Sequence, residues 1–270
     1  MIYLYVCLAI IIAVLIYMRY EASTVKVERI KFTLSKKGLK IIQLSDIHIK
    51  YLKVSAQTVR KVIERENPDI IIFTGDYIDK PNHINKFLYF LEQIKSSSTA
   101  MYLCLGNHDY EAFEQYDGSI LQDFINMLEN QGITVLHNRA VCYTKNSVKY
   151  NVIGIEDLST GKPNIDEALY FCSKEAFVNI AFSHNPDIVF EIPKGKVDFL
   201  FCGHFHGGQI WMPFNLEFKL LRKEILCKMG ITRGLHRING INLYINRGLG
   251  NVCFPLRFLS KPEITIFHLP

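Results

Sequence analysis

Apolar residues form one long run at the start of the chain and many short runs further on. Residues 1–18 contain no charged residue, no proline and no glycine. As a helix, eighteen residues at about 1.5 Å each span roughly 27 Å, close to the hydrocarbon thickness of a membrane. Tyrosines lie at both ends of the run, where aromatic rings favour the membrane–water interface. The pattern therefore predicts a transmembrane anchor over residues 1–20.

A secretory signal peptide is the alternative interpretation of this segment. Such a peptide carries Lys or Arg before its apolar run and a small-residue cleavage site after it. No Lys or Arg precedes the run, and Glu21-Ala22-Ser23 is a poor cleavage site. We therefore favour an uncleaved, single-pass anchor in the cell membrane.

Basic residues follow the apolar run, and only the α-amino group precedes it. They are Arg19, Lys26, Arg29, Lys31, Lys36 and Lys37. The positive-inside rule then favours the cytoplasmic side for the rest of the chain, and seven cysteines without a CxxC pair agree with a reducing compartment. Long domains can cross a membrane regardless of flanking charge, so the opposite side stays open.

The remainder of the chain alternates between short strands and helices. Residues 25–34 alternate apolar and polar positions and predict a half-buried edge strand. Five apolar runs predict strands buried on both faces: Leu39–Leu44, Ile70–Phe73, Met101–Leu105, Val178–Phe182 and Phe199–Cys202. Helical periodicity covers about 55–66, 84–96 and 119–131, whereas 133–155 is typical of hairpins. We therefore predict an α/β fold with a mixed or parallel sheet and a second sheet.

Composition and charge exclude several classes of protein. Hydrophobic residues make up 49% and charged residues 21% of the chain, which excludes intrinsic disorder. The formal net charge of +5 is too small for a dedicated nucleic-acid-binding protein, and we expect no nucleic-acid partner. No obligate protein partner is indicated either.

Polar residues follow each of the five buried strands. The clusters are Ser45-Asp46-Ile47-His48, Gly75-Asp76-Tyr77-Ile78-Asp79, Gly106-Asn107-His108-Asp109, Ser183-His184-Asn185 and Gly203-His204-Phe205-His206. Ligands of open α/β folds bind at the carboxyl ends of strands. Because five of the nine histidines lie in these clusters, we expect the strand ends to form one polar site.

The side chains in these clusters are suited to metal binding. Carboxylates, amides and imidazoles are ligands for Mn, Fe, Zn or Mg. In extended backbone, residues two apart point to the same side, so Asp46 with His48 and His204 with His206 each present a pair of ligands. The seven candidate ligands are Asp46, His48, Asp76, Asn107, His184, His204 and His206. One ion rarely uses seven, whereas two ions about 3.5–4 Å apart and bridged by a carboxylate use such a set.

Helix and turn capping is the alternative role for three of these residues. Asp46, Asp76 and Asn107 are residue types that often cap helices and turns after strands. Because all three lie in clusters that also contain histidine, we favour metal binding.

The ordered clusters resemble the calcineurin-like metallophosphoesterase superfamily. They match its blocks as Asp46-x-His48, Gly75-Asp76-x-x-Asp79, Gly106-Asn107-His108-Asp109, His184 and Gly203-His204-x-His206, all between residues 39 and 209. The tail, with Arg247-Gly248-Leu249-Gly250, Pro255, Arg257 and Pro262-Glu263-Ile264, resembles the membrane-associated bacterial branch, which is close to hydrolases of UDP-2,3-diacylglucosamine. The resemblance implies a four-layer α/β/β/α sandwich over 39–270, preceded by the anchor at 1–20 and a juxtamembrane segment with an edge strand at 21–38.

The resemblance also implies a role for each site residue. Asp46, His48 and His206 would hold the first of two divalent ions, with Mn favoured, and Asn107, His184 and His204 would hold the second. Asp76 would bridge both ions, and water activated by them would attack phosphorus in line. His108 would donate a hydrogen bond to the phosphoryl oxygen or protonate the leaving group. Asp79 and Asp109 would orient histidine rings or the loop backbone.

The segment 211–237 lies just beyond the last cluster and carries most of the net charge. Its six basic and two acidic residues give +4. Phe218, Leu221, Ile225 and Met229 recur at spacings of 3, 4 and 4, which predicts one apolar helix face. We therefore predict a basic, apolar lip, including Trp211, Lys219, Arg222 and Lys223, that holds an amphiphilic substrate against a bilayer. An ordinary helix packed on the core is the alternative.

Together these features predict a membrane-anchored phosphoesterase with two divalent ions. Its substrate would carry a phosphodiester or pyrophosphate bond, in a lipid-linked or nucleotide-sugar-lipid molecule resembling UDP-2,3-diacylglucosamine. A broad phosphomonoesterase and a non-catalytic lipid-binding adaptor stay open as alternatives.

Overall fold

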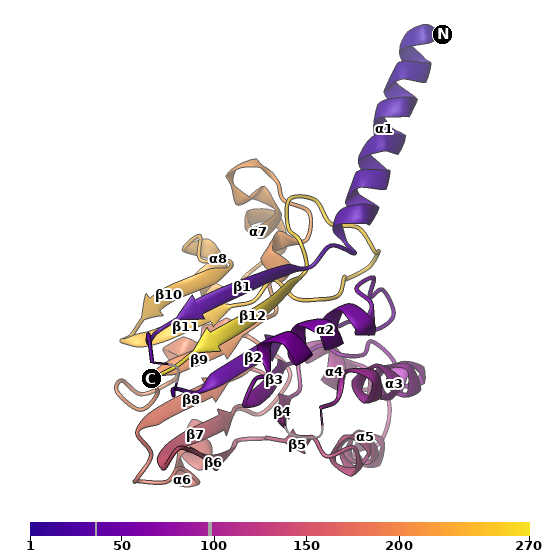
Figure 1. Cartoon of the computed structure of the whole chain (residues 1–270). Helices are drawn as coiled ribbons and strands as arrows, with labels where there is room; N and C mark the ends of the chain where they lie inside the picture. Colours follow the sequence, from indigo (N-terminus) through magenta and orange to yellow (C-terminus); the bar gives the residue numbers. More distant parts are fainter. Residues whose placement is uncertain (36, 97–98) are drawn as a thin grey trace.

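The computed structural model describes residues 1–35, 37–96 and 99–270 (Figure 1). Lys36, one of the basic residues on which the predicted sidedness depends, lies outside the described residues. Two six-stranded sheets form the body of the protein, and one long helix extends away from it (Figure 1).

The first sheet contains the strands that precede three of the polar clusters. Its order is β1-β12-β2-β3-β4-β5, and all neighbours are parallel except β12 and β2. The strands are β1 (Lys26–Lys31), β2 (Lys40–Leu44), β3 (Ile70–Thr74), β4 (Ala100–Cys104), β5 (Thr134–Val135) and β12 (Glu263–His268). The predicted edge strand is confirmed, because β1 pairs only with β12 at the end of this sheet.

The second sheet is parallel in its centre and ends in an antiparallel hairpin on each side. Its order is β10-β11-β9-β8-β7-β6. The strands are β6 (Arg139–Lys145), β7 (Val148–Gly154), β8 (Val178–Phe182), β9 (Phe199–Cys202), β10 (Gly234–Ile238) and β11 (Ile241–Ile245). Within the predicted hairpin region 133–155, β6 and β7 form an antiparallel pair of this second sheet, whereas β5 belongs to the first sheet.

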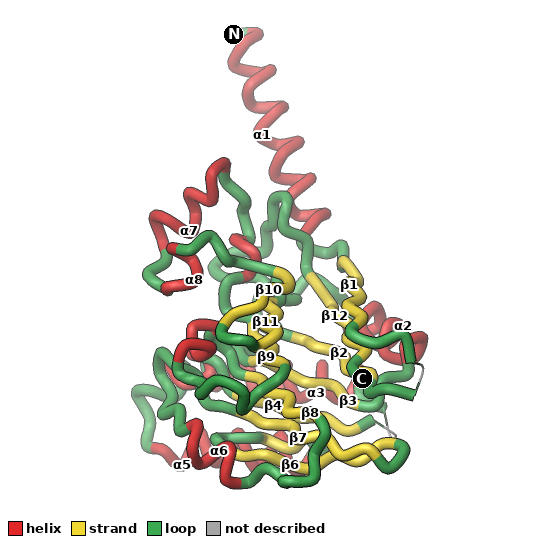
Figure 2. Tube along the Cα trace, turned by 90° about the vertical axis from the view of Figure 1, so that its left-hand side faces the viewer, coloured by secondary structure: helices red, strands yellow, loops and turns green. Residues whose placement is uncertain are grey.

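Three separate clusters of buried apolar side chains show that the fold has four layers. One cluster joins β2 and β3 to Val59, Phe87 and Phe124 of the helices over the first sheet. The second cluster lies between the sheets, where the rings of Phe201 and Phe267 stack 4.0 Å apart. The third joins the outer face of the second sheet to the helices there. The predicted α/β/β/α sandwich is therefore confirmed (Figure 2).

The helices fall into two sets, one for each outer face. The first set is α2 (Ala56–Glu66), α3 (Ile84–Ile94), α4 (Asn107–Glu111) and α5 (Gly118–Asn130), with the 3₁₀ turn η1 (Pro81–His83). The second set is α6 (Ile165–Tyr170), α7 (Leu216–Leu221) and α8 (Ile225–Lys228), with η2 (Pro186–Phe190), η3 (His206–Gly208) and η4 (Pro213–Asn215). The predicted helices at 55–66, 84–96 and 119–131 match α2, α3 and α5.

Helix α1 (Ile2–Glu21) is long and apolar enough to cross a membrane, although signal sequences share these properties. Most of its side chains are exposed, but its last turn packs into the body of the protein. The Arg257 amide donates to Met18 O at 3.1 Å, and the Leu259 amide donates to Glu21 Oε2 at 3.0 Å. The carboxyl end of α1 is thus held by the loop that precedes β12.

The prediction of a single amphipathic helix within 211–237 is wrong. The structure has the short helices α7 and α8 there, because the backbone becomes extended at Arg222. Phe218 is buried while Leu221 and Ile225 are exposed, so the predicted apolar face is divided. The break lets Arg222 and Glu224 turn inward, where both contact His204.

Candidate metal centre

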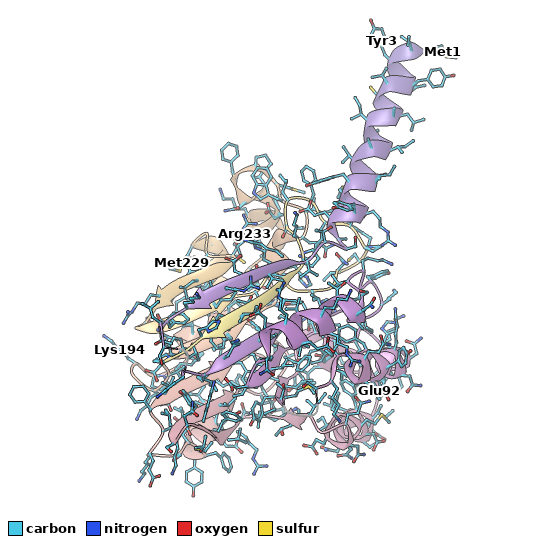
Figure 3. All side chains as sticks on the ribbon, viewed as in Figure 1. Met1, Tyr3, Glu92, Lys194, Met229 and Arg233 are labelled. Carbon is cyan, nitrogen blue, oxygen red and sulfur yellow. The ribbon has the colours of Figure 1, made fainter. Side chains whose placement is uncertain are left out.

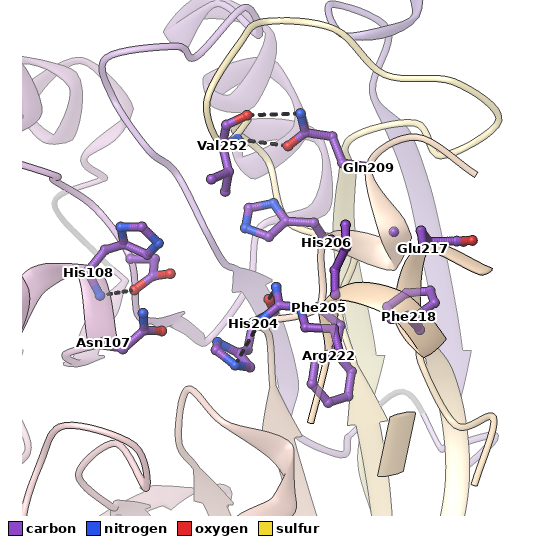
Figure 4. A pocket seen from close by; sticks show the side chains of 13 residues that line it. Asn107, His108, His204, Phe205, His206, Gln209, Glu217, Phe218, Arg222 and Val252 are labelled. Carbon is purple, nitrogen blue, oxygen red and sulfur yellow. Dashed lines mark hydrogen bonds between the residues drawn. The ribbon is translucent and has the colours of Figure 1, made fainter. Parts of the chain in front are cut away.

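The polar clusters meet in a pocket of about 160 Å³ at the carboxyl ends of strands from both sheets. Asn107 and His108, which follow β4, lie on one side (Figure 4). His204, His206 and Arg222 lie on the other side, so the pocket bridges the two sheets (Figure 4). The strand order explains this meeting, because β2, β3 and β4 belong to one sheet whereas β8 and β9 belong to the other.

One group of buried ligand atoms comes from Asp46, His48, Asp76 and His206. Each residue offers one ligand atom, and these four ligand atoms all lie within 4.8 Å of one another. His206 Nε2 lies 3.2 Å from Asp46 Oδ1, and His48 Nε2 lies 3.5 Å from Asp76 Oδ2. These are the three residues expected at the first ion together with the expected bridge.

A second group contains Asp76, His184 and His204. His184 Nε2 lies 3.1 Å from Asp76 Oδ2 and 3.1 Å from His204 Nδ1. Asn107 lines the same pocket, and its Oδ1 atom is buried without a hydrogen-bond partner. Asp76 therefore belongs to both groups, as a residue that bridges two ions must.

Three of the histidines have one ring nitrogen anchored, and the other nitrogen lies against Asp76 in His48 and His184 and against His184 in His204. His48 Nδ1 lies 3.1 Å from Asp79 Oδ1, His184 Nδ1 lies 2.8 Å from Thr74 O, and His204 Nε2 lies 2.9 Å from Glu224 Oε1. Such partners fix the tautomer and the ring orientation of metal-binding histidines. The His48 Nε2 and His206 Nδ1 atoms are buried without a partner. An unpaired buried polar atom costs about 1–3 kcal/mol. Metal ions bound to these atoms would remove that cost, so this donor set fits two divalent ions.

The buried carboxylates make the site favourable for positive charge. Burial opposes protonation of His48 and His184, but the neighbouring carboxylates, Asp76 foremost, raise the pKa of each to about 10. Burial would raise the pKa of Asp76, yet His184 and His48 hold it well below its usual range. Burial, with the positive field of His48 and Arg257, lowers the pKa of His206. The site thus combines two buried carboxyl side chains, Asp46 and Asp76, with imidazoles, a set of ligand types that binds divalent cations.

Backbone strain is concentrated at the candidate ligands. Positive φ angles occur at Asp46 (48°), His48 (36°), Asp76 (60°), His204 (75°) and His206 (52°). Each left-handed non-glycine residue costs of order 1 kcal/mol or more, and such residues cluster at functional sites. The expectation of extended backbone at these positions was therefore wrong. The pairs Asp46/His48 and His204/His206 reach the pocket through tight left-handed turns.

Glycines next to the ligands allow the clusters to approach one another. A Cβ atom on Gly106 would collide with the Asp76 side chain, and one on Gly203 would collide with Ser45 and Asp46. These positions require glycine because no larger residue fits between the strand ends.

The two acidic residues that were expected to support the ligands have different partners. Asp109 accepts hydrogen bonds from the amides of Asp76 (2.8 Å), Tyr77 (2.8 Å), Ile78 (3.1 Å) and Gly106 (2.9 Å), and so holds the loop that carries Asp76. Burial and the nearby Asp76 carboxylate raise the pKa of Asp109 to about 7. Asp109 thus fixes backbone and contacts no histidine ring in the described hydrogen bonds.

Asp79 connects a candidate ligand to His108. Its Oδ1 atom lies 3.1 Å from His48 Nδ1 and 3.4 Å from His108 Nδ1. Burial opposes ionisation of this carboxyl, but the two histidines hold its pKa below its usual range. Burial opposes protonation of His108, yet Asp79 and Asp76 raise its pKa. His108 lines the pocket, and its contacts with Asp79 and Glu111 are both made by its Nδ1 atom.

Sequence reasoning missed one carboxylate of the site and misplaced one arginine. Glu224 was counted only as a charge, but it contacts His204 Nε2 at 2.9 Å. Arg222 was assigned to an outer lip, but it lines the pocket and donates to His204 O at 2.9 Å. Lys219 and Lys223 are exposed, and Trp211 is half-buried. No local pattern identifies Glu224, because its partner lies twenty residues away on another element.

A fully buried arginine holds the loop beneath His206. Arg257 donates to the carbonyls of Arg247 (2.9 Å), Gly250 (2.5 Å) and Ser260 (3.0 Å). Ser260 Oγ in turn donates to His206 O at 3.1 Å. The loop that carries Arg257 also holds the end of α1, so it links that helix to the candidate metal centre.

Comparison with known proteins gives family-level matches. The family described as "Calcineurin-like phosphoesterase" matches residues 39–208. The uncharacterized metallophosphoesterase YkoQ of Bacillus subtilis is 32% identical over 250 residues, which cover 92% of this chain and 89% of YkoQ. The UDP-2,3-diacylglucosamine pyrophosphatase LpxG of Chlamydia trachomatis is 27% identical, and the match covers 92% of this chain and 90% of LpxG.

A solved structure supports the fold. The sulfate thiohydrolase SoxB of Thermus thermophilus superposes with a TM-score of 0.51 at 10% identity. The superposition covers 88% of this chain and 58% of SoxB, so this chain spans little more than half of that protein.

Proposed function

The chain belongs to the calcineurin-like phosphoesterase family, and we propose that it is a membrane-anchored dinuclear phosphoesterase that cleaves a pyrophosphate or phosphodiester bond in a lipid-linked substrate. The observation that carries the proposal is the pair of ligand groups that share Asp76. Hydrolase chemistry with a dinuclear metal site follows from the family.

In this proposal each ion has its own protein ligands. Asp46, His48 and His206 would hold the first, and Asn107, His184 and His204 would hold the second. Asp76 would serve both ions, and manganese is the ion that we favour. Such ions would supply positive charge that stabilises phosphoryl oxygens and lowers the pKa of water toward neutrality.

The remaining chemistry belongs to His108 and Asp79. The Asp79 carboxylate orients the His108 ring through Nδ1, and its charge favours the protonated imidazole. Protonated His108 then donates from Nε2 to a phosphoryl oxygen or to the leaving oxygen, which stabilises the negative charge that develops there. Arg222 adds a fixed positive charge on the opposite wall of the pocket (Figure 4).

The proposed substrate class rests on the relative LpxG and on the apolar side chains at the pocket. LpxG acts on UDP-2,3-diacylglucosamine, a lipid that carries a pyrophosphate. Phe218, Leu221 and Val252 line the pocket beside the polar residues, so it offers contacts to an amphiphilic molecule as well as to a phosphate.

The proposed anchor is residues 1–20, followed by a juxtamembrane segment at 21–38 and the catalytic domain at 39–270. The exposed apolar surface of α1 supports a membrane span. The burial of Glu21 and Ala22 supports an uncleaved helix, because cleavage there would remove contacts of the fold. We propose the cytoplasmic side for the domain, in keeping with the basic residues after the helix.

A substrate panel tests the proposed activity on the full chain with Mn²⁺. It includes UDP-2,3-diacylglucosamine, bis-p-nitrophenyl phosphate, p-nitrophenyl phosphate and phosphatidylglycerol. We expect the pyrophosphate and diester substrates to exceed the monoester by about tenfold or more in kcat/KM, a barrier difference of about 1.4 kcal/mol. EDTA should stop all hydrolysis. Preference for the monoester would support a phosphomonoesterase instead, and metal binding without hydrolysis of any substrate would support the adaptor.

Glu224→Gln is expected to weaken one ion selectively. The carboxylate fixes His204 through Nε2, and loss of such a partner usually lowers metal affinity by about 10–100-fold. A Mn²⁺ titration followed by electron paramagnetic resonance should show one weakened site and one unchanged site, with an unchanged Tm. The exposed Glu175→Gln is the matched control. Equal affinities in Glu224→Gln and in the wild type would show that Glu224 does not position His204.

A further inference from the structure

Strongly exposed apolar side chains lie on two segments of the chain that each also contribute a residue to the pocket wall, Leu221 on one and Val252 on the other. Phe214, Leu220 and Leu221 belong to the segment with η4 and α7, and their exposed fractions are 81%, 75% and 77%. Phe254 (46%) and Leu259 (51%) belong to the loop before β12. We name these five residues the apolar rim. An exposed apolar surface of this kind marks an interaction site.

The two loops are joined to each other and to the end of α1. The Trp211 amide donates to Phe258 O at 2.9 Å, and the Phe258 amide donates to Gln209 O at 2.9 Å. The ring of Phe258 meets the ring of Tyr17 at 6.0 Å, edge to face. The two segments that carry the apolar rim are therefore joined to each other and to the carboxyl end of α1, where the Leu259 amide also donates to Glu21.

The figures place the rim segments at one end of the molecule. Helix α7 and the loop before β12 lie at the end of the body from which α1 extends (Figures 1 and 2). With all side chains drawn, those of this region extend on the same side as α1 (Figure 3). A bilayer crossed by α1 would thus meet the rim at its surface.

The charges around the rim fit an anionic lipid surface. Lys219, Lys223 and Lys228 are exposed. Both acidic residues of the segment are turned inward, since Glu217 accepts from the Met212 amide at 3.1 Å and Glu224 contacts His204. The outer surface is thus apolar and basic, the combination that binds to negatively charged membrane interfaces.

We infer that the apolar rim inserts into the membrane interface beside α1, with the neighbouring lysines against anionic headgroups. The pocket then opens at the bilayer surface, because Leu221 belongs both to the rim and to the pocket wall. A lipid-borne phosphoester would reach the candidate metal centre without leaving the membrane. This use of the rim rests on the proposed function, whereas the insertion itself does not.

The lipid contact predicted for the lip must be tested with residues that lie outside the pocket. Arg222 contacts His204 and lines the pocket, so its charge reversal would disturb the site itself. Phe214 and Leu220 are exposed and do not line the pocket, so they test lipid contact alone.

The single tryptophan of the chain is a natural probe of this surface. Trp211 lies at the start of the rim segment and is half-buried. The full chain is reconstituted into vesicles of phosphatidylcholine and phosphatidylglycerol, with or without acyl chains brominated near the headgroup. We expect brominated lipid to quench the Trp211 fluorescence by about half or more. If the rim is inserted, bromine atoms near the headgroups lie within contact range of the Trp211 ring.

Variants separate the rim from the anchor. Phe214→Glu with Leu220→Glu should still float with the vesicles through α1 but should lose most of the quenching. The matched control is Tyr170→Glu, which changes an aromatic residue that is 84% exposed on α6, at the opposite end of the body (Figure 1). This control should keep the quenching of the wild type.

Each outcome bears on the inference independently of catalysis, because no substrate is present. Quenching that is absent in the wild type, or unchanged in the double variant, would overturn the rim as a lipid contact and would favour a protein partner there. A chain that fails to float would overturn the anchor and the rim together. Quenching as expected in a protein that hydrolyses nothing would leave the rim supported and would refute only the proposed function.

Discussion

Asp76→Ala is expected to abolish hydrolysis and to remove most metal binding at both positions. The Asp76 side chain is buried, and its Oδ2 atom lies 3.1 Å from His184 Nε2 and 3.5 Å from His48 Nε2. In our proposal this carboxylate is the ligand that allows two like-charged ions to lie about 3.5–4 Å apart. The other ligands cannot offset that repulsion without it.

The measurement for Asp76→Ala is the metal content of each chain by elemental analysis, together with turnover. The exposed Asp123→Ala removes a carboxylate from the surface of α5 and serves as the control. Two ions per chain and near-normal turnover in Asp76→Ala would show that the site does not depend on a shared carboxylate.

His108→Ala is expected to reduce turnover by about 10²–10⁴ while the metal content stays near that of the wild type. The ring of His108 lines the pocket, and Asp79 contacts its Nδ1 atom at 3.4 Å. We propose that it acts on the substrate and is not a ligand. Removing it should therefore lower kcat with little change in metal affinity.

A third group of possible metal ligands, which includes His108, makes the metal content of His108→Ala decisive. His48, Asp79 and His108 also lie close enough to one another to hold an ion. If His108→Ala lost metal and activity in equal measure, His108 would be a ligand in that group. His236→Ala, which changes a histidine outside the pocket, is the control.

The strands and their polar ends could be predicted from the sequence because both signals are local. Val178–Phe182, apolar except at Asn179, and Phe199–Cys202, apolar throughout, predict strands, and the structure has strands at the same residues. The polar residue that follows each strand needs no tertiary information to be placed at the strand end. The ligand types and their order along the chain can therefore be read from the sequence alone.

The geometry of the site could not be predicted in the same way. Residues two apart were expected to share a face in extended backbone, yet His204 and His206 have φ angles of 75° and 52° and belong to different ligand groups. Left-handed backbone is unfavourable locally and persists only because the surrounding fold enforces it. Sequence periodicity carries no signal for such a conformation.

The partners of Arg222 and Glu224 could not be predicted either, because they lie far away in the sequence. Periodicity predicted one helix through Arg222, but the contacts of Arg222 and Glu224 with His204 outweigh local helix propensity and end α7 there. Glu21 was considered only as part of a poor cleavage site, but it is buried and accepts from the Leu259 amide. Its partner is more than two hundred residues away in the chain.

The central claim is that Asp76 joins two metal ions in one catalytic centre. The most direct measurement is an anomalous difference map from crystals of the Mn²⁺-loaded protein, recorded at a wavelength where manganese scatters anomalously. Our account predicts two peaks about 3.5–4 Å apart, both in contact with Asp76, one beside His48 and His206 and the other beside His184 and His204. A single peak, or two peaks that do not share Asp76, would contradict it.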